Sequence, residues 1–227
     1  MGIPSAVAHS PGEGRILWGM DQATLDYYSR RAPELAAVYE LAHGGVADRF
    51  EATFPTPMRI LDVGAGAGRH MARLRQLGHD AWGVEPILEF RSAAWTLHED
   101  VALHMVPGGL PADLPPVAEL GGPFDAILCN GVMMHLPESA LVAAATTLRS
   151  CLKPGGRLMF TVPLDRPGLD GECRDKAGRL FTTLSPEKWT SYLTDSGFTV
   201  LDRWEDKDLL GRPGHHWLGL LLQAGKD

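Results

Sequence analysis

Short apolar runs alternate along this chain with longer segments in which apolar residues recur at helical spacing. The run at residues 60–63, broken only by Asp62, is typical of a strand buried on both faces of a parallel sheet. Comparable runs predict strands at residues 81–84, 103–106, 124–129, 157–162, 199–203 and 217–222. Helical segments are predicted at residues 69–77, 87–98, 140–152 and 185–193. The alternation predicts an α/β fold with a parallel sheet and helices on both faces.

The N-terminal part of the chain has a different pattern. Residues 1–15 are rich in Gly, Pro and Ser, and we expect them to be flexible. Residues 21–50 have apolar residues at helical spacings around Pro33, which we expect to start the second of two helices. Later, Lys-Pro-Gly-Gly at residues 153–156 predicts a turn that ends a helix before the next strand. We predict a flexible N-terminus at 1–15, a helical segment at 16–55 and the main domain at 56–227.

A glycine-rich turn and two acidic residues follow the first two strands. Asp62 lies near the end of the first strand, and Gly64, Gly66 and Gly68 come after it. Glycines let the chain turn tightly and let a ligand touch the backbone before the next helix begins. Glu85 ends the second strand, where a carboxylate can bind both hydroxyls of a ribose. The pattern indicates a site for an adenosine-containing cofactor; a turn that serves only the fold is the alternative.

The residue after the third glycine decides between two classes of cofactor. A dinucleotide site of the G-x-G-x-x-G type requires a small residue where this chain has Arg69. The spacing Asp62-x-Gly64-x-Gly66-x-Gly68 instead resembles the first motif of the Rossmann-like S-adenosylmethionine-dependent methyltransferases. The resemblance implies that the turn, including Ala65, cradles the methionine part of the cofactor. It also implies that Asp62 lies near the amino acid end, and that Glu85 and Pro86 lie at the ribose.

The segment around residue 130 resembles the fourth motif of the same family. Asn130, Gly131 and Val132 follow the fourth strand, at the sheet edge where open α/β sheets bind ligands. His135 comes one short turn later. Its functional interpretation is a general base or a group that orients the substrate, because imidazole accepts a proton near neutral pH. The alternative is a histidine that caps the next helix or fixes the loop.

The adenine site departs from the family pattern. Related enzymes often place an acid that contacts the adenine where this chain has Gly109 and Leu110. The next acid in this chain, Asp113, lies beyond that position. We therefore expect the backbone of Gly109 and Leu110 to bind the adenine, with Ile87 and Val132 near its faces. We expect Asp113 to lie on the loop surface.

The segment Tyr27-Tyr28-Ser29-Arg30-Arg31-Ala32 resembles the entry helix of small-molecule methyltransferases. The resemblance implies that a tyrosine hydroxyl reaches the cofactor carboxylate as the helix closes over the site. Tyr28 is the candidate for this contact, and the alternative candidates are Tyr27, Arg31 and Tyr39. An amphipathic helix whose tyrosines only pack is the alternative.

Composition and charge narrow the partners. The chain has 227 residues and a formal net charge of −7, which argues against a face built to neutralise nucleic-acid phosphates. No apolar run approaches the length of a membrane span, and the three cysteines lack disulfide or zinc spacing. We expect a cytoplasmic monomer or homodimer that binds neither nucleic acid nor membrane.

Two groups of polar residues near the C-terminus suggest ligands. His215 and His216 suggest a metal, but neighbouring residues in a strand point to opposite faces, so we expect no metal site. Four arginines in this part of the chain could bind an acidic substrate: Arg166, Arg174, Arg179 and Arg212. The alternative is that they are solvated loop residues.

The resemblance covers most of residues 25–222. It implies a seven-stranded, mostly parallel Rossmann-like sheet with an antiparallel last strand, under an N-terminal helical lid. It also implies methyl transfer from S-adenosylmethionine, with S-adenosylhomocysteine as product. A small-molecule acceptor is favoured because the chain is short and we see no appended recognition domain. A peptide or protein methyltransferase is the alternative, and a non-enzymatic cofactor-binding protein is the third hypothesis.

Overall fold

A single mixed sheet forms the centre of the computed structural model, which describes residues 20–42, 44–55 and 57–226. The predicted flexible segment at 1–15 lies outside the described residues. The strands are β1 (Arg59–Val63), β2 (Asp80–Val84), β3 (Met105–Val106), β4 (Phe124–Asn130), β5 (Leu152–Asp165), β6 (Phe198–Lys207) and β7 (His216–Ala224). Their order is β3-β2-β1-β4-β5-β7-β6, and β7 runs antiparallel to β5 and β6. The other pairs are parallel, which confirms the predicted Rossmann-like arrangement.

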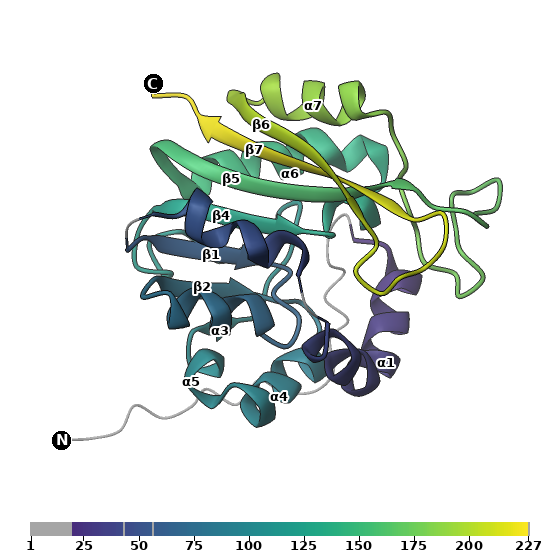
Figure 1. Cartoon of the computed structure of the whole chain (residues 1–227), viewed down its shortest axis with the longest axis horizontal. Coiled ribbons are helices and arrows are strands. Elements are labelled where there is room, and N and C mark those ends of the chain that lie inside the picture. The colour runs from purple at the N-terminus through teal and green to yellow at the C-terminus, as the bar shows by residue number, and fades with distance from the viewer. Residues whose placement is uncertain (1–19, 43, 56, 227) are drawn as a thin grey trace.

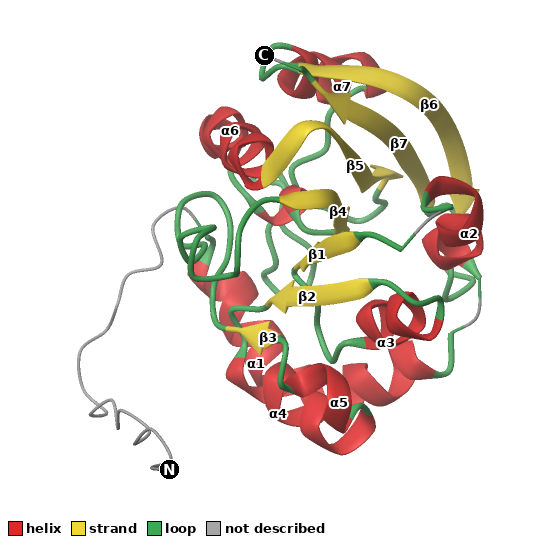
Figure 2. Cartoon of the chain, turned by 90° about the vertical axis from the view of Figure 1, so that its left-hand side faces the viewer, coloured by secondary structure: helices red, strands yellow, loops and turns green. Residues whose placement is uncertain are grey.

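Helices cover both faces of the sheet. They are α1 (Gln22–Glu40), α2 (Phe50–Thr53), α3 (Arg69–Gln76), α4 (Leu88–Leu97), α5 (Glu99–Ala102), α6 (Leu141–Cys151) and α7 (Pro186–Thr194). Short 3-10 turns are η1 (Gly45–Arg49), η2 (Met133–His135) and η3 (Glu138–Ala140). Figure 2 shows α3 on one face of the sheet and α6 on the other. Helix α7 packs against α6 and β6.

The central strands are buried on both faces, as the unbroken apolar runs predicted. Ile60 packs with Phe50 and Met71 on the side of α2 and α3. Leu61, the next residue, packs with Leu148 of α6 on the opposite side. Successive side chains of a strand point to opposite faces, so a strand covered twice needs apolar residues at consecutive positions.

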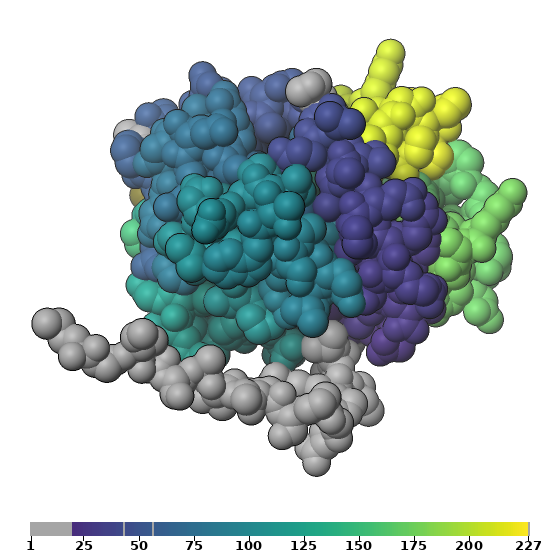
Figure 3. Space-filling model, turned by 90° about the horizontal axis from the view of Figure 1, so that it is seen from below, coloured from purple at the N-terminus to yellow at the C-terminus, as the bar shows by residue number. Residues whose placement is uncertain are grey.

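Helix α1 continues through Pro33, so the prediction that this proline starts a second helix is wrong. Asp21 caps the helix by accepting a hydrogen bond from the Thr24 backbone N–H. Pro33 is exposed, while Ala32 and Ala36 are buried in a cluster with Phe90 of α4. In Figure 3 the surface of α1 (purple) lies beside that of α4 and α5 (teal). Packing against α4 therefore outweighs the local helix-breaking tendency of proline.

Strand β5 is longer than the sequence predicted. It begins at Leu152, directly after α6, and includes residues 153–156, which we expected to form a turn. Leu152 pairs with Phe124 of β4, and the register then shifts before Arg157 pairs with Ala126. The predicted turn is thus an irregularity inside the strand, with Gly155 at a φ of 76°.

Several distant segments meet at the carboxyl ends of the parallel strands. Helix α1 and the loop between β6 and β7 both lie at this edge of the sheet (Figure 1). The order of the strands reverses between β1 and β4, and ligands of open α/β sheets bind at such a switch point. No helix within the described ranges is long and apolar enough to cross a membrane.

Candidate functional site

The glycine turn after β1 has backbone angles that favour glycine. Gly64 and Gly66 have φ values of 73° and 57°, which residues with a Cβ rarely adopt. A Cβ on Gly64 would lie 2.4 Å from Cγ2 of Val132, whereas one on Gly66 would meet no atom within 4 Å. The turn therefore packs tightly against the loop after β4 at Gly64, and its backbone borders open space at Gly66.

Asp62 places a buried carboxyl group next to this turn. Its Oδ2 atom is buried and has no hydrogen-bond partner among the described residues. Burial, with a smaller contribution from the Glu85 carboxylate, raises the pKa of Asp62 to about 7. An unpaired buried oxygen is costly, so this position suits a ligand group that carries positive charge or donates a hydrogen bond.

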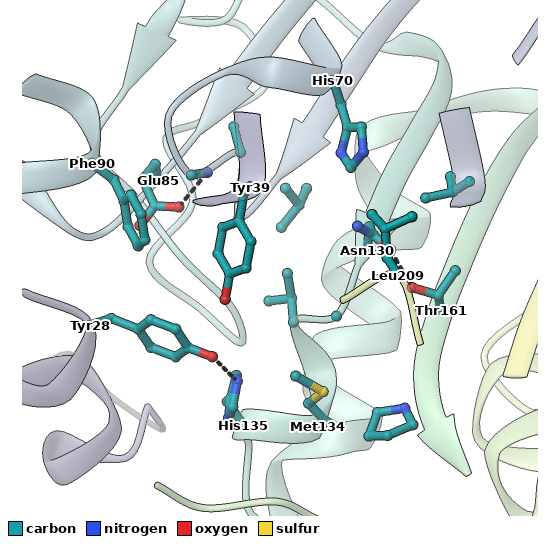
Figure 4. A pocket seen from close by; sticks show the side chains of 18 of the residues that line it. Tyr28, Tyr39, His70, Glu85, Phe90, Asn130, Met134, His135, Thr161 and Leu209 are labelled. Atoms are coloured by element: carbon teal, nitrogen blue, oxygen red, sulfur yellow. Dashed lines mark hydrogen bonds between the residues drawn. The ribbon is translucent and has the colours of Figure 1, made fainter. Parts of the chain in front are cut away.

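Glu85 connects the end of β2 to the glycine turn. Its Oε2 accepts a hydrogen bond from the Gly66 N–H at 2.8 Å, and its Oε1 accepts one from the Ile87 N–H at 2.9 Å. Figure 4 shows the carboxyl group at one end of the cavity, next to Phe90. Burial raises the pKa of Glu85 to about 7, although both backbone bonds favour its charged form. Each oxygen retains a lone pair for a ligand hydroxyl.

The loop after β3 forms another part of the wall. Leu110 and Ile87 are buried and line the same cavity as Glu85, together with Gly109 and Pro86. The N–H and C=O of Gly109 are both hydrogen-bonded to the backbone of Asp113. Leu110 is therefore the better candidate for the expected backbone contact with the adenine. Asp113 is half-buried and does not line the cavity.

The end of β4 lies between the two halves of the sheet. Asn130 accepts a hydrogen bond through its Oδ1 from the Thr161 hydroxyl of β5 at 2.5 Å. The Gly131 N–H donates to the Thr161 carbonyl at 3.0 Å, and Val132 packs on Gly64. These contacts tie β4, β5 and the glycine turn together at the cavity wall.

Tyr28 of α1 and His135 of η2 meet across the cavity. The Tyr28 hydroxyl lies 3.0 Å from Nε2 of His135. The dashed line between the two labelled side chains in Figure 4 marks this contact. Nδ1 of His135 lies 2.7 Å from the Leu180 carbonyl, which can only accept, so the proton is on Nδ1. Tyr28 must then donate to Nε2, and it accepts a bond from the Arg179 guanidinium at 3.2 Å. Burial lowers the pKa of His135 to about 4, so the imidazole is neutral at neutral pH.

The loops that flank the last strands bring arginines to the cavity. Arg166 and Arg179, between β5 and α7, both pair with Asp175, and Arg212 pairs with Asp208 between β6 and β7. These three arginines line the cavity. Arg174 does not; it pairs with Asp21 at the start of α1.

All of the predicted site residues except Gly68 line a single cavity of about 300 Å³. Gly68 precedes α3 and packs against Val101 and Met105. The cavity also contains residues that the sequence did not single out, among them Thr24, His70, Phe90, Phe181 and Leu209. His70 directly follows Arg69 after the glycine turn, so its position was a usable signal. Phe181 and Leu209 lie on long loops whose path no periodicity predicts.

The neighbouring histidines near the C-terminus point to different partners. His215 Nδ1 lies 3.0 Å from the Pro213 carbonyl, and His216 Nδ1 lies 3.1 Å from the Asp165 carboxylate. Within residues 20–42, 44–55 and 57–226, no group of three or more His, Cys, Asp or Glu side chains is arranged to hold a metal ion.

Two curated relatives illustrate the sequence similarity. The ubiquinone biosynthesis O-methyltransferase of Xylella fastidiosa (strain 9a5c) is 28% identical over 66% of this chain and 51% of its own length. The tRNA U34 carboxymethyltransferase of Idiomarina loihiensis (strain ATCC BAA-735 / DSM 15497 / L2-TR) is 30% identical over 45% of this chain and 32% of its own length. The chain thus spans about half the length, or less, of the curated relatives it matches.

Solved structures share the fold over most of the chain. The 1,6-didemethyltoxoflavin-N1-methyltransferase of Burkholderia thailandensis, solved with 1,6-didemethyltoxoflavin and S-adenosylhomocysteine, has a TM-score of 0.66 and 24% identity. It covers 89% of this chain and 88% of its own. The [4+2]-cyclase SpnF has a TM-score of 0.67 at 16% identity, over 92% of this chain and 99% of its own. At these identities the similarity establishes the fold.

Family assignment rests on a longer match. The profile of the family described as "Methyltransferase domain" matches residues 35–203, from within α1 to within β6. That range includes the glycine turn, both buried acids, Asn130 and His135. The chain therefore belongs to the methyltransferase domain family.

Proposed function

We propose that this protein transfers a methyl group from S-adenosylmethionine to a small-molecule acceptor. The observation that carries the proposal is the buried Oδ2 of Asp62, which has no partner in the described part of the chain. Asp62 lines the same cavity as the open glycine turn and Glu85. The family match supports the same reaction class, and the fold neighbour with bound S-adenosylhomocysteine supports the same cofactor.

The residues of the cavity fit the parts of this cofactor. Asp62 would bind the ammonium group, because a cation satisfies the unpaired oxygen and favours the charged carboxylate. The open backbone at Gly66 would lie against the methionine part, and Glu85 would accept hydrogen bonds from the ribose hydroxyls. Ile87 and Leu110 would enclose the adenine. When bound, S-adenosylmethionine supplies a methyl group activated by a positively charged sulfur.

The protein residues contribute mainly by orienting the acceptor and excluding water. Helix α1 covers the carboxyl ends of the strands and brings Tyr28 to His135. A pKa of about 4 makes His135 a weak base, and its Nε2 is already bonded to Tyr28. We therefore assign His135 first to positioning the nucleophile, whose O–H or N–H would replace the Tyr28 hydroxyl as the donor to Nε2, and only second to accepting its proton. Tyr28 positions His135 in the structure, and its role toward the cofactor carboxylate stays a prediction.

A small acceptor fits this cavity better than a peptide or a nucleic acid. The cavity is lined by helix α1, through Tyr28 and Tyr39, and by the loop at Leu209. Its charged side chains include both acids and arginines, rather than charges of one sign. The net charge of −7 disfavours an extended phosphate-binding face. We also propose a cytoplasmic location and a monomeric or homodimeric state. Size-exclusion chromatography with light scattering tests the oligomeric state.

Calorimetric titration with S-adenosylhomocysteine, S-adenosylmethionine and NAD tests the cofactor assignment. We expect both adenosyl compounds to bind and NAD not to bind. Glu85→Gln should weaken S-adenosylhomocysteine binding about tenfold or more, because charge-assisted hydrogen bonds to the ribose are lost. Glu89→Gln, on α4 outside the cavity, is the matched control. Tight binding of NAD alone would refute the assignment, and an unchanged affinity in Glu85→Gln would place the ribose elsewhere.

The acceptor class has a separate test. The protein is incubated with S-adenosylmethionine labelled in its methyl group and with either the small-molecule or the macromolecular fraction of a cell extract. We expect label to pass to the small-molecule fraction. Label found only in protein or RNA would contradict the proposal.

A further inference from the structure

Three arginines gather at one end of the cavity, and this inference about them rests on the proposed function. Arg166 and Arg179 come from the loop after β5, and Arg212 comes from the loop before β7. The side chains of Arg166 and Arg179 are 10% and 11% exposed, so both are largely removed from solvent. Arg179 is near enough to both other arginines to lower their pKa values, and Arg212 also lowers the pKa of Arg166.

The charges of this cluster are not balanced within it. Asp175 is shared by Arg166 and Arg179, at 3.2 and 2.6 Å, while Asp208 pairs with Arg212. Three guanidinium groups thus face two carboxylates, which leaves one positive charge. Asp175 does not itself line the cavity. The acids that do, apart from Asp208, are engaged elsewhere or lie at the glycine turn: Glu40 contacts His98, Asp206 contacts Trp204, and Asp62 and Glu85 border the turn.

Arg166 has a guanidinium nitrogen that no described residue binds. Its Nε atom is buried and has no hydrogen-bond partner among the described residues, and its terminal nitrogen reaches Asp175 only at 3.2 Å. The guanidinium carbon lies 4.0 Å from the centre of the Phe181 ring, a distance at which the cation and the ring attract each other. A planar, buried guanidinium with a free donor matches the two oxygens of a carboxylate.

The position of the cluster places it on the acceptor side. Glu85 follows β2 and Asp62 lies in β1, whereas the arginines follow β5 or precede β7, on the other side of β4. His135, after β4, lies between the two groups and is joined to Arg179 through the Tyr28 hydroxyl. Phe181, Met134 and Trp217 also line this part of the cavity and offer apolar surface for the body of a small molecule.

We propose that Arg166, Arg179 and Arg212 form a subsite for the carboxylate of the methyl acceptor, which is therefore an apolar or aromatic small molecule with a single negative charge. The carboxylate would neutralise the excess positive charge, and a shift of the Arg166 side chain would let it accept a hydrogen bond from the buried Nε. The body of the acceptor would lie against Phe181 and Trp217, with its nucleophile toward His135.

Binding to the protein saturated with S-adenosylhomocysteine tests the subsite without an activity assay. The probes are substituted benzoates, each paired with its neutral benzamide and with the matching phenyl phosphate, titrated by calorimetry. We expect at least one benzoate to bind about tenfold or more tightly than its amide. If no benzoate is preferred, or if the phosphates bind more tightly than the benzoates, the proposal is wrong.

Variants distinguish the arginines from the rest of the protein. Arg166→Gln should bring the benzoate-to-benzamide preference close to one, and Arg166→Lys should restore part of it. Lys176→Gln removes the same charge from an exposed position in the same loop and should leave the preference unchanged. A preference that survives in Arg166→Gln would overturn the proposal. If thermal unfolding shows that Arg166→Gln is not folded, Arg212→Gln makes the same test from the other loop.

The cofactor provides the remaining distinction. Arg166→Gln should leave the affinity for S-adenosylhomocysteine unchanged; an equal loss of both affinities would mean that the arginines bind the cofactor carboxylate, and the proposal would be wrong. If wild-type protein does not bind S-adenosylhomocysteine, the proposed function fails. Titration of benzoates onto the protein alone then still decides whether the carboxylate subsite exists.

Discussion

Asp62 and Glu85 place two carboxyl groups in a buried site where neither forms an ion pair with a described residue. The pKa of each is raised to about 7, and burial is the largest cause in both cases. Their positions are fixed by the backbone, since Glu85 accepts N–H groups from Gly66 and Ile87. A site that holds this much unfavourable desolvation is typical of one built to bind a ligand rather than to stabilise the fold.

Asp62→Asn should change how stability depends on pH. The pKa of Asp62 is about 7 in the folded protein, against 3.8 for an aspartate exposed to water, so between these pH values the folded state holds a proton that the unfolded state has lost. Stability therefore falls as pH rises from about 4 to about 7. The asparagine variant lacks this loss, so relative to wild type it should gain roughly 2 to 4 kcal/mol between pH 4 and pH 8.

Denaturant unfolding without ligand, repeated across this pH range, measures the gap between the two proteins. Asp195→Asn, an exposed change of the same kind, is the control. A gap that is the same at every pH would mean that Asp62 ionises normally in the folded protein.

Tyr28→Phe should raise the pKa of His135. The hydroxyl of Tyr28 donates to Nε2 and so favours the neutral imidazole, in addition to the effect of burial. Without that donor we expect the pKa to rise from about 4 by roughly one unit. Imidazole NMR titration measures the change, and Tyr27→Phe, the neighbouring hydroxyl, is the matched control. An unchanged pKa would leave burial as the sufficient cause.

Helix α1 is the element that closes the cavity. Residues far away in sequence contact it at its start and along its length. Asp21 at its start pairs with Arg174, and the Thr24 hydroxyl accepts a bond from the Leu180 N–H. Farther along, Ala32 and Ala36 pack with Phe90 of α4. These contacts join the helix to both the cofactor side and the acceptor side of the proposed site.

Pro33→Ala should stabilise the protein. Proline in a helix interior has no N–H for the carbonyl four residues earlier, and its ring crowds that carbonyl. Because Pro33 is exposed, the replacement loses little packing, and we expect a gain of about 1 to 3 kcal/mol in the free energy of unfolding. S-adenosylhomocysteine affinity should not change.

Chemical denaturation of the variant gives the first quantity and calorimetry the second. Ala37→Gly, at an exposed position in the following turn, should lower stability by about 1 kcal/mol and shows that the helix unfolds with the rest. A loss of stability in Pro33→Ala would mean that the proline is needed where it stands.

At the scale of the whole molecule, the order of the strands arranges the chemistry along the sheet. Glu85 follows β2, Asp62 lies in β1, Asn130 and His135 follow β4, and the arginines flank β5 and β7. The proposed donor and acceptor sites therefore lie on opposite sides of the switch point between β1 and β4. The same fold supports a methyltransferase and a [4+2]-cyclase among the solved neighbours, so the side chains at this edge, not the fold, decide the reaction.

The sequence predicted the elements of the sheet and the cofactor half of the candidate site. Asp62, the glycine turn and Glu85 lie in one strand-helix-strand unit, where strand pairing brings the end of β1 beside the end of β2. Where local preference competed with packing, at Pro33 and at residues 153–156, the predictions were wrong. A helix-breaking residue and a Pro-Gly pair indicate only the local preference of the backbone. Contacts of Pro33's helix with α4, and of residues 152–157 with β4, outweighed that preference.

What the sequence alone determined is the α/β fold and the motif around the glycine turn, because periodicity and short-range spacing encode both. The tertiary structure decided the acceptor half. It alone brought Tyr28 to His135, 107 positions away, and gathered Arg166, Arg179 and Arg212 from two irregular loops around one cavity. Loop paths and burial follow from the packing of the whole chain. No local pattern therefore predicts that Nε of Arg166 lacks a partner among the described residues, or that the cluster has an excess positive charge.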